Sequence, residues 1–534
     1  MSHALVVHDL HFGWPEGDPV FDGLSMAVGP GRTGLVGANG SGKSTLFRLV
    51  TGELTPQGGS ITRQGTVGYL RQDLTLDATQ PIDEVLGVAD VRRAIDAIER
   101  GDVADEHFAT VGDDWDVDER ARATLDRLGL AHVGLDRRVG ELSGGEAVLL
   151  GLAAQFLRRP DIILLDEPTN NLDLHARRRL YDGVAGWAGV MLIVSHDREL
   201  LERMDAIAEL RDGRVRTFGG NFTAYEQAVA VEQEAAERGV RAAEADVRRQ
   251  QRELVEAQVK LSRRPRYAKK MFENTREPRA VMRARKRTAQ ESAGKHRILQ
   301  TERLDAARER LAAAEDAVRD DAEIIVDLPE TAVPTGRTVL TIEAAELRCG
   351  PIVDLVLRGP ERVALLGPNG SGKTTLLETV TGRLDPVGGS VRAAVPLRYL
   401  PQRLTVLDDA DTIVEAVGRL ASHATDHAIR SRLARFRFRG DRADQLVGTL
   451  SGGERFRATL AALLLAEPAP QLLLLDEPTN SLDLASARQL SQALAGYQGA
   501  LIVASHDLAF LRTLGISRWM RIDGRLAEID EPES

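Results

Sequence analysis

The chain contains the same series of short motifs twice, in the same order. GANGSGKST (37–45) recurs as GPNGSGKTT (367–375), LSGGE (142–146) recurs at 450–454, and IILLDEPTNNLD (162–173) recurs as LLLLDEPTNSLD (472–483). A repeat of this length indicates that one folding unit is present twice, because both copies must form the same strands, turns and helices. The repeat therefore predicts two similar domains in a chain whose 534 residues are too many for a single core.

The spacing of the motifs indicates where the two copies differ. YLRQ (69–72) recurs as YLPQ (399–402), and Ser143 of the first LSGGE motif recurs as Ser451 of the second. The chain between YLRQ and Ser143 is longer than the chain between YLPQ and Ser451. We therefore expect an insertion at about residues 85–125 of the first copy.

Short apolar runs mark the strands of each copy. GLVGANG, IILLDEP and MLIVSHD are typical of buried parallel strands, and each is followed by a segment of helix-forming residues. This alternation indicates an α/β fold. We expect residues 1–225 and 323–534 to form two similar α/β domains. Residues 226–322, in which Ala, Arg, Glu and Gln dominate, would join them.

The pattern GxxxxGK[ST] occurs once in each copy. Glycines allow backbone N–H groups to surround phosphate oxygens, and the following helix directs its positive N-terminus at the anion. A chance glycine-rich turn is the alternative for one match, but two matches with the same downstream motifs argue against it. We expect Lys43 and Lys373 to reach the β- and γ-phosphates of ATP, and Ser44 and Thr374 to bind Mg²⁺. The ATP contacts expected from these loops are Gly37, Asn39, Gly40, Gly42, Lys43, Ser44, Thr45, Gly367, Asn369, Gly370, Gly372, Lys373, Thr374 and Thr375.

An Asp–Glu pair follows four apolar residues in each copy. Asp166 and Asp476 are placed at the end of a buried strand, where they would orient the water shell of the metal ion. The following glutamates, Glu167 and Glu477, are candidates to accept a proton from the attacking water. His196 and His506 come later in the chain, at the same distance from their aspartates and behind another strand, and are the candidates to touch the γ-phosphate. The alternative is structural: Asp–Glu pairs also cap helices, and a lone histidine is usually part of a core.

Together these motifs resemble the ATP-binding-cassette (ABC) ATPases, and the LSGGE sequence is specific to that superfamily. The resemblance implies that Gln72 and Gln402 are Q-loop glutamines, and that Mg²⁺ is held by Ser44, Gln72, Asp166, Thr374, Gln402 and Asp476. It also implies two composite sites, in which two cassettes close head to tail around two ATP molecules. The motifs of the first copy would then face Ser451, Gly452 and Gly453, and those of the second would face Ser143, Gly144 and Gly145.

ABC cassettes usually stack adenine on an aromatic residue upstream of the phosphate loop. The first copy offers Trp14, with Phe12 as the alternative. The second copy has ELRCGPIVD at the comparable place, without an aromatic residue. The second site is therefore expected to bind adenine less well, unless Arg348 stacks on it instead.

A short basic segment lies near the middle of an acidic chain. Residues 263–287 carry eleven Lys or Arg and two acids, so their net charge is +9, whereas the whole chain has a net charge of −11. Val240, Val247, Leu254 and Leu261 precede it at intervals of seven residues, and Leu304, Leu311 and Val318 follow it in the same way. Heptad spacing on both sides, with Pro265 and Pro278 between, predicts a long antiparallel helical hairpin whose turn region is 262–300.

The basic segment is expected to contact RNA. Cations neutralise phosphates and release counterions, and aromatic or arginine planes stack on splayed bases. The alternative is that the charges form only a solvated face. The expected RNA contacts are Arg263, Arg264, Arg266, Tyr267, Lys269, Lys270, Arg276, Arg279, Arg283, Arg285, Lys286 and Arg287.

Two cassettes joined by a charged two-helix linker resemble the ABC-F family, whose members bind ribosomes. This resemblance implies that the linker enters the tRNA exit-site region and approaches the peptidyl-transferase centre, where it would meet large-subunit rRNA and tRNA. The insertion in the first copy would correspond to the short "arm" of that family. Its residues 102–119 hold eight acids and no Lys or Arg, so we expect it to face solvent or a basic ribosomal protein.

The short arm, together with a chain end soon after His506, resembles the antibiotic-resistance branch of ABC-F, which protects ribosomes from drugs. Three alternatives remain open: a general translation factor, the ATPase subunit of an exporter with separate membrane partners, and a DNA-repair or chromosome ATPase. The exporter hypothesis leaves the basic segment unexplained. The DNA-repair hypothesis lacks the much longer coiled coil or zinc module that such proteins insert.

The cysteine content, the apolar runs and the N-terminal sequence indicate where the protein acts in the cell. Cys349 is the only cysteine, which excludes a disulfide framework and Cys-ligated clusters, and we expect it to be a small buried apolar residue. No run of 18 apolar residues occurs, and the N-terminus does not resemble a signal peptide. We therefore expect a cytoplasmic protein, and a monomer if its two cassettes pair with each other.

Overall fold

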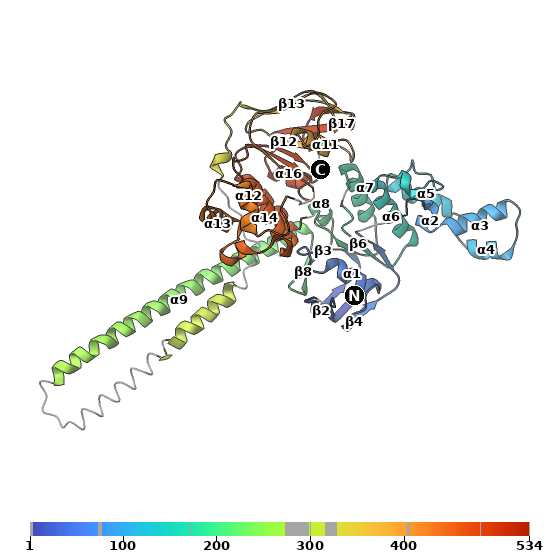
Figure 1. The fold of residues 1–534 in the computed structure, drawn as a ribbon. Helices are drawn as coiled ribbons and strands as arrows, with labels where there is room; N and C mark the ends of the chain where they lie inside the picture. The colour runs from blue at the N-terminus through green and yellow to red at the C-terminus, as the bar shows by residue number, and fades with distance from the viewer. Residues whose placement is uncertain are drawn as a thin grey trace. The chain divides into compact units, whose positions relative to one another are not determined.

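The computed structural model describes residues 4–15, 17–72, 77–170, 172–272, 298–299, 301–315, 328–402, 406–480 and 482–532. Its contacts divide the chain into two units (Figure 1). One unit combines Met1–Thr223 with Glu323–Ser534 and therefore holds both copies of the repeat. The other unit is Ala224–Ala322.

The first copy contains two sheets. Three antiparallel strands form one of them in the order β2 (Pro19–Val28), β1 (Leu5–Gly13) and β4 (Gly58–Arg63). The other has six strands in the order β5 (Val67–Leu70), β6 (Ile162–Asp166), β7 (Val190–Val194), β3 (Gly31–Val36), β8 (Ala206–Arg211) and β9 (Arg214–Gly219). All neighbours in the second sheet are parallel except β8 and β9. Every residue of β6 and β7 is buried, which is why these strands are continuous apolar runs in the sequence.

The second copy has one nine-stranded sheet with the same central arrangement. The strand order is β13 (Gly388–Ala393), β10 (Thr338–Glu346), β11 (Ile352–Arg358), β18 (Arg525–Ile529), β17 (Arg518–Asp523), β12 (Arg362–Leu366), β16 (Ala500–Ala504), β15 (Leu472–Asp476) and β14 (Leu397–Leu400). Strands β14, β15, β16, β12 and β17 are parallel, as are their counterparts in the first copy. The predicted α/β fold with two similar domains is confirmed.

The helices of the two copies follow equivalent strands. In the first copy they are α1 (Lys43–Thr51), α2 (Ile82–Leu86), α6 (Gly144–Arg158), α7 (Leu174–Ala185) and α8 (Arg198–Leu201). In the second copy they are α11 (Lys373–Val380), α12 (Ile413–Leu420), α13 (Asp426–Leu433), α14 (Gly452–Leu464), α15 (Leu484–Ala495) and α16 (Leu508–Thr513). Each strand that carries a repeated motif therefore leads into a helix, and the motif lies at the junction.

The predicted insertion of the first copy is helical. It contains α3 (Ala89–Glu99), α4 (Asp105–Val111) and α5 (Val117–Arg127). Arg92 of α3 forms ion pairs with Asp83, Asp118 and Asp136, at 2.7 to 2.9 Å. This one guanidinium therefore connects α3 to α2, to α5 and to the chain before α6, the helix that begins within the first LSGGE motif.

The second unit contains the longest helix, α9 (Phe222–Phe272, 51 residues). Residues 301–315 are also helical, and Arg310 Nη1 lies 2.8 Å from Asp246 Oδ2 of α9. Leu304 is buried, and Val240, Val247, Leu254 and Leu311 are half-buried among exposed neighbours. The heptad residues thus lie on the less exposed side of each helix, whereas the turn of the predicted hairpin lies outside the described residues.

One expectation about this unit is wrong. The turn region was expected to begin at residue 262, before Pro265, but α9 continues through Pro265 to Phe272. Proline fixes φ near the helical value and removes one backbone hydrogen bond. A helix of this length can lose that bond locally without ending.

The lone cysteine also differs from expectation. Cys349 is exposed, not buried, and lies in the turn between β10 and β11. Turns run over the surface because their backbone groups need water or capping partners, so the position in the chain outweighs the apolar character of the thiol. Among the described residues, no helix has the length and apolar character needed to cross a membrane.

Candidate functional site

The two phosphate loops join β3 to α1 and β12 to α11. Each helix begins at the lysine of the GxxxxGK[ST] pattern, directly after a glycine with positive φ: 98° at Gly42 and 101° at Gly372. A Cβ at position 42 would lie 2.7 Å from Val20 Cγ1, and one at position 372 would lie 2.6 Å from Cys349 Sγ. Both the backbone conformation and the available space therefore require glycine, and each loop leaves the N–H groups of its helix N-terminus open.

The two loop lysines are buried and directed at their own loops. Lys43 Nζ donates to Gly37 O (2.8 Å) and Ala38 O (2.9 Å), and Lys373 Nζ donates to Gly367 O (2.8 Å) and Pro368 O (3.1 Å). Burial lowers the pKa of both lysines, and the neighbouring glutamates Glu167 and Glu477 oppose this effect. Each ammonium group is thus held at the centre of a loop whose backbone N–H groups suit an anion.

Two tyrosines hold the strand-end aspartates. Tyr69 Oη donates to Asp166 Oδ2 (3.2 Å), and Tyr399 Oη donates to Asp476 Oδ2 (3.1 Å). Burial and the aspartate charge raise the pKa of both tyrosines, so each remains a hydrogen-bond donor. The sequence motifs indicate no role for these tyrosines, although both occupy the same place in the repeated motifs YLRQ and YLPQ.

The glutamates after these aspartates have an unusual backbone. Glu167 has a φ of 47° and Glu477 a φ of 44°, in the left-handed region that residues other than glycine rarely adopt. Strained conformations of this kind gather at functional sites. Burial raises the pKa of Glu477 to about 7, and burial likewise raises the pKa of Glu167. Both carboxyl groups can therefore exchange a proton near neutral pH.

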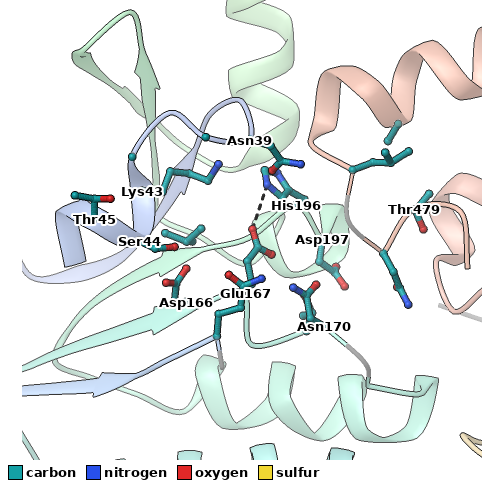
Figure 2. Close-up of a pocket in the computed structure, with 18 of the residues that line it drawn as sticks. Asn39, Lys43, Ser44, Thr45, Asp166, Glu167, Asn170, His196, Asp197 and Thr479 are labelled. Atoms are coloured by element: carbon teal, nitrogen blue, oxygen red, sulfur yellow. Dashed lines mark ion pairs between the residues drawn. The ribbon is translucent and has the colours of Figure 1, made fainter. Parts of the chain in front are cut away.

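The two histidines lie beside these glutamates. His196 Nε2 is 3.2 Å from Glu167 Oε1 (Figure 2), and His506 Nε2 is 3.3 Å from Glu477 Oε1. Burial and the nearby loop lysine lower the pKa of both histidines, that of His506 to about 2, so the imidazoles are neutral. Lys373 Nζ lies 3.0 Å from His506 Nε2. Because the ammonium can only donate, Nε2 accepts and the proton of this imidazole lies on Nδ1.

The residues at the second strand end fit a magnesium ion. Asp476 Oδ1 is buried and has no hydrogen-bond partner among the described residues, and Thr374 forms a side-chain hydrogen bond to the same carboxyl group. Burial raises the pKa of Asp476, because an ionised carboxylate is costly there without a cation. Hard oxygen ligands with phosphate oxygens nearby are what Mg²⁺ prefers.

A cavity of about 1160 Å³ lies at the first phosphate loop. It is lined by residues of the first copy, which include Asn39, Lys43, Ser44, Gln72, Asp166, Glu167 and His196, and by residues of the second copy, which include Gln402, Arg455, Thr479, Asn480 and Leu482 (Figure 2). Trp14 also lines it and is 44% exposed, whereas Phe12 is buried and contacts Trp14 edge to face. The structure thus places Trp14, and not Phe12, where a ligand of this cavity could reach it.

The two copies meet at this cavity. Asn39 N donates to Asp483 Oδ2 of the second copy (3.0 Å), and a Cβ at Gly452 would lie 4.0 Å from Asn39 Cβ. Neither Ser451 nor Gly453 of the second LSGGE motif, however, is among the described residues that line the cavity. Arg455, which follows this motif, does line it. Ser451 Oγ instead accepts from Glu454 N (3.4 Å) and caps α14.

A smaller cavity of about 320 Å³ lies at the second phosphate loop. Its lining among the described residues comes from the second copy and comprises Asn369, Gly370, Gly372, Lys373, Thr374, Thr375, Gln402, Asp476, Glu477, Asn480 and His506. Ser143, Gly144 and Gly145, expected opposite this loop, are not among them. Ser143 Oγ accepts from Glu146 N (3.3 Å) and caps α6. The structure therefore brings the two copies together around the first loop more closely than around the second.

Two further expectations concern residues near or beyond these cavities. Arg348, the alternative adenine contact, donates its Nε to Asp385 O (3.3 Å). The expected RNA contacts Arg263, Arg264, Arg266, Tyr267, Lys269 and Lys270 belong to the C-terminal end of α9, where only the backbone is described. Arg276, Arg279, Arg283, Arg285, Lys286 and Arg287 lie outside the described residues.

Similarity to known proteins extends over most of the chain. The family model described as "ABC transporter" matches residues 21–170 and 352–480, one match in each copy. The tylosin resistance ATP-binding protein TlrC of Streptomyces fradiae is 34% identical over 514 residues, which span 91% of this chain and 92% of that protein. The energy-dependent translational throttle protein EttA of Mycobacterium tuberculosis is 31% identical over 528 residues, 92% of this chain and 87% of that protein.

A solved structure has the same fold at lower identity. The structure titled "RNase-L Inhibitor" aligns with a TM-score of 0.57 and 19% identity, covering 98% of this chain and 89% of that one. Its likeness concerns the fold of the paired nucleotide-binding domains.

Proposed function

The chain belongs to the ABC-F family of tandem ATP-binding-cassette ATPases, and we propose that it uses ATP hydrolysis to control its own binding to the ribosome. The observation that carries this proposal is the similarity along nearly the whole chain to one protein named for tylosin resistance and another named as a translational throttle. An alignment of that extent leaves less of this chain uncovered than the length of the segment between the cassettes, where we place the ribosome contact.

In this proposal each cassette binds one ATP at its phosphate loop. Lys43 and Lys373 would bind the β- and γ-phosphates, and the N–H groups of each loop would bind the remaining phosphate oxygens. Mg²⁺, when bound, would neutralise phosphate charge, and Ser44, Gln72 and Asp166 or Thr374, Gln402 and Asp476 would hold it.

The glutamate of each cassette would accept the proton of the attacking water. Burial raises the pKa of Glu477 to about 7, which suits an acceptor near neutral pH. His196 and His506 are neutral and lie against these glutamates, so each can orient the carboxyl group. Both cassettes retain every one of these residues, which supports hydrolysis at both sites.

The basic segment 263–287 would form the ribosome contact. Its net charge of +9 suits the rRNA backbone, and in this proposal the linker reaches toward the tRNA exit site and the peptidyl-transferase region. The continuation of α9 to Phe272 supports the idea that its first arginines and lysines are presented on a helix. ATP would favour the closed pair of cassettes with the linker inserted, and hydrolysis would release it. The chain would act as a cytoplasmic monomer, because its two cassettes pair with each other.

Co-sedimentation with ribosomes tests this proposal. The Glu167→Gln, Glu477→Gln double variant with ATP is expected in the 70S or 50S fractions of a sucrose gradient, because blocked hydrolysis traps the closed form. The matched control carries Lys43→Ala and Lys373→Ala, cannot hold the phosphates, and should remain at the top. Recovery of the hydrolysis-blocked variant only at the top of the gradient would refute the proposed function.

We further propose that ribosome binding confers antibiotic resistance. The tylosin resistance protein is 34% identical across 92% of its own length, which supports this role. The test is to express the chain in a susceptible host and to measure inhibitory concentrations of antibiotics of the large subunit, tylosin included. A rise for at least one drug is expected. If ribosome binding persists while no inhibitory concentration changes, the chain is a general translation factor.

A further inference from the structure

An arginine with a largely buried side chain occurs in the first cassette, and the second cassette has another residue at the matching position. Arg177 lies in α7, and its side chain is 11% exposed. Its Nη1 lies 3.2 Å from Asp197 Oδ2, and its Nε donates to Leu172 O (3.2 Å). When the two LDEPTN motifs are aligned, the residue that corresponds to Arg177 in the second copy is Ala487.

The aspartates near this arginine occur in both cassettes. Asp197 follows His196 and caps α8 through Oδ1, which accepts from Leu200 N (3.0 Å). Asp507 follows His506 and caps α16 in the same way, with Phe510 N as the donor (2.8 Å). Each aspartate is therefore fixed by its helix, and its second carboxyl oxygen is left for another partner. In the first cassette that partner is Arg177, together with Tyr181 Oη at 2.7 Å from Asp197 Oδ2.

The two aspartates approach each other where the cassettes meet. A narrow cavity is lined by Arg177 and Asp197 of the first cassette and by His506, Asp507 and Leu508 of the second. Leu174, at the start of α7, packs against the apolar core of the second cassette, which includes Leu508. Helix α7 therefore packs against the second cassette. The guanidinium of Arg177 faces the segment that follows His506.

The charges explain why a cation is needed at this place. Burial raises the pKa of Asp507 above its ordinary value and the negative charge of Asp197 raises it further, whereas the hydrogen bond from Phe510 N, Arg177 and Arg198 lower it. Two buried carboxyl groups from different cassettes would repel each other if no cation lay near both. Arg177 is the cation that pairs with Asp197, at 3.2 Å, and Arg198 also lies near Asp507. The second cassette has Ala487 and Ser491 in place of Arg177 and Tyr181, so it has no cation at these matching positions.

We propose that Arg177 is a positioning residue that holds the two cassettes together during ATP hydrolysis by pairing at once with Asp197 of its own cassette and Asp507 of the other. It links the segments after both histidines, so closure at one ATP site is transmitted to the other. The arrangement is asymmetric, because the first cassette provides the arginine that pairs with the aspartates of both cassettes. Arg177 also lines the cavity at the first phosphate loop, but its hydrogen bond and ion pair go to Leu172 and Asp197 and not to the loop itself, so its effect is expected on turnover more than on nucleotide affinity.

The test is steady-state ATP hydrolysis by the full chain. Arg177→Met is expected to lower kcat roughly tenfold, the order expected when one member of a buried charge group is removed, and to change KM less than about threefold. Arg177→Lys keeps the charge and should retain at least about a third of the parent kcat. Arg122→Met, at an exposed arginine of α5, is the matched control and should change neither constant.

A second-site variant separates this role from a purely structural one. In the Asp507→Asn background the helix cap is retained but the repulsion is gone, so Arg177→Met should lower kcat less than about threefold. The proposal is overturned if Arg177→Met alone leaves kcat within about twofold of the parent. It is also overturned if Arg177→Met lowers kcat by the same factor in the Asp507→Asn background. The effect of Arg177 would then not depend on the charge of Asp507. If Arg177→Met does not fold, a tenfold loss of kcat in the folded Arg177→Lys variant overturns it.

Discussion

Asn39 of the first phosphate loop donates its backbone N–H to Asp483 Oδ2 of the second cassette over 3.0 Å. The other oxygen of this carboxylate, Oδ1, accepts from Ser486 N (2.8 Å) and caps α15. Burial tends to raise the pKa of Asp483, but these hydrogen bonds lower it below its ordinary value, so the carboxylate is ionised. One charged group thus joins a phosphate loop to a helix of the opposite cassette.

Loss of this carboxylate should uncouple the two cassettes. Asp483→Ala is expected to lower kcat for ATP hydrolysis roughly tenfold, because a buried charge-assisted hydrogen bond is worth about 1.5–3 kcal/mol. The cap of α15 is lost as well, so the control must also lose a cap. Thr425→Ala removes the cap of α13, away from both cavities, and should cost about 1 kcal/mol of stability with little change in kcat. Equal kcat values for the two variants would contradict the coupling.

The raised pKa of Glu477 predicts how stability depends on pH in the absence of nucleotide and magnesium. The ordinary pKa is 4.5 and the folded value is about 7, so the folded state binds the proton more tightly. This contribution to stability is fully present below about pH 4.5 and is lost as pH rises to about 7, and it amounts to roughly 3 kcal/mol. Glu477→Gln removes the titration. Its Tm should therefore exceed the parent Tm by an amount that grows from pH 5 to 7 and then stays constant. A difference independent of pH would show that the pKa is not raised.

Tyr69 and Tyr399 should determine the affinity for magnesium. Tyr399→Phe removes the donor to Asp476 Oδ2 and should increase the Mg²⁺ concentration for half-maximal ATP hydrolysis, because residues that orient metal ligands typically contribute 10- to 100-fold in metal affinity. Tyr69→Phe should have the same effect through Asp166. Tyr497→Phe is the control, since its buried hydroxyl donates to Ala500 O, away from the metal ligands. An unchanged Mg²⁺ requirement in both test variants would exclude this role.

The basic segment predicts a salt-dependent ribosome contact. Replacement of Arg263, Arg264, Arg266, Lys269 and Lys270 by Gln should weaken ribosome binding and reduce the dependence of the binding constant on salt, because fewer counterions are released. ATP hydrolysis without ribosomes should be unchanged. The matched control replaces five exposed arginines nearer the start of α9, namely Arg238, Arg241, Arg248, Arg249 and Arg252. If both variants bind equally well, the contact does not depend on charge at the end of α9.

Much of the site follows from the sequence because its elements are local. The phosphate loops, the strand-end Asp–Glu pairs and the histidines are each defined by a strand, a turn and a helix that are consecutive in the chain. The steric demand for glycine at position 42, or the buried run before Asp166, acts within such a unit and leaves a recognisable pattern. The duplicated α/β fold follows for the same reason, since each copy repeats these patterns in the same order.

The sequence was less informative where a property depends on residues distant in the chain. The turn position of Cys349 exposes the thiol, and α9 continues past Pro265, although composition and proline placement favoured the opposite. The roles of Tyr69 and Tyr399 required knowledge of which strand lies beside β6 and β15.

Repetition and local pattern therefore determined the fold class and the chemistry of each phosphate loop. Tertiary structure alone decided which carboxylate reaches across to Asn39, and that Arg177 and Asp197 line the same narrow cavity as Asp507 of the other cassette. The reason is physical: backbone conformation is governed by neighbours in sequence, whereas burial of a charge and its choice of partner are set by surfaces that meet only after both domains have folded.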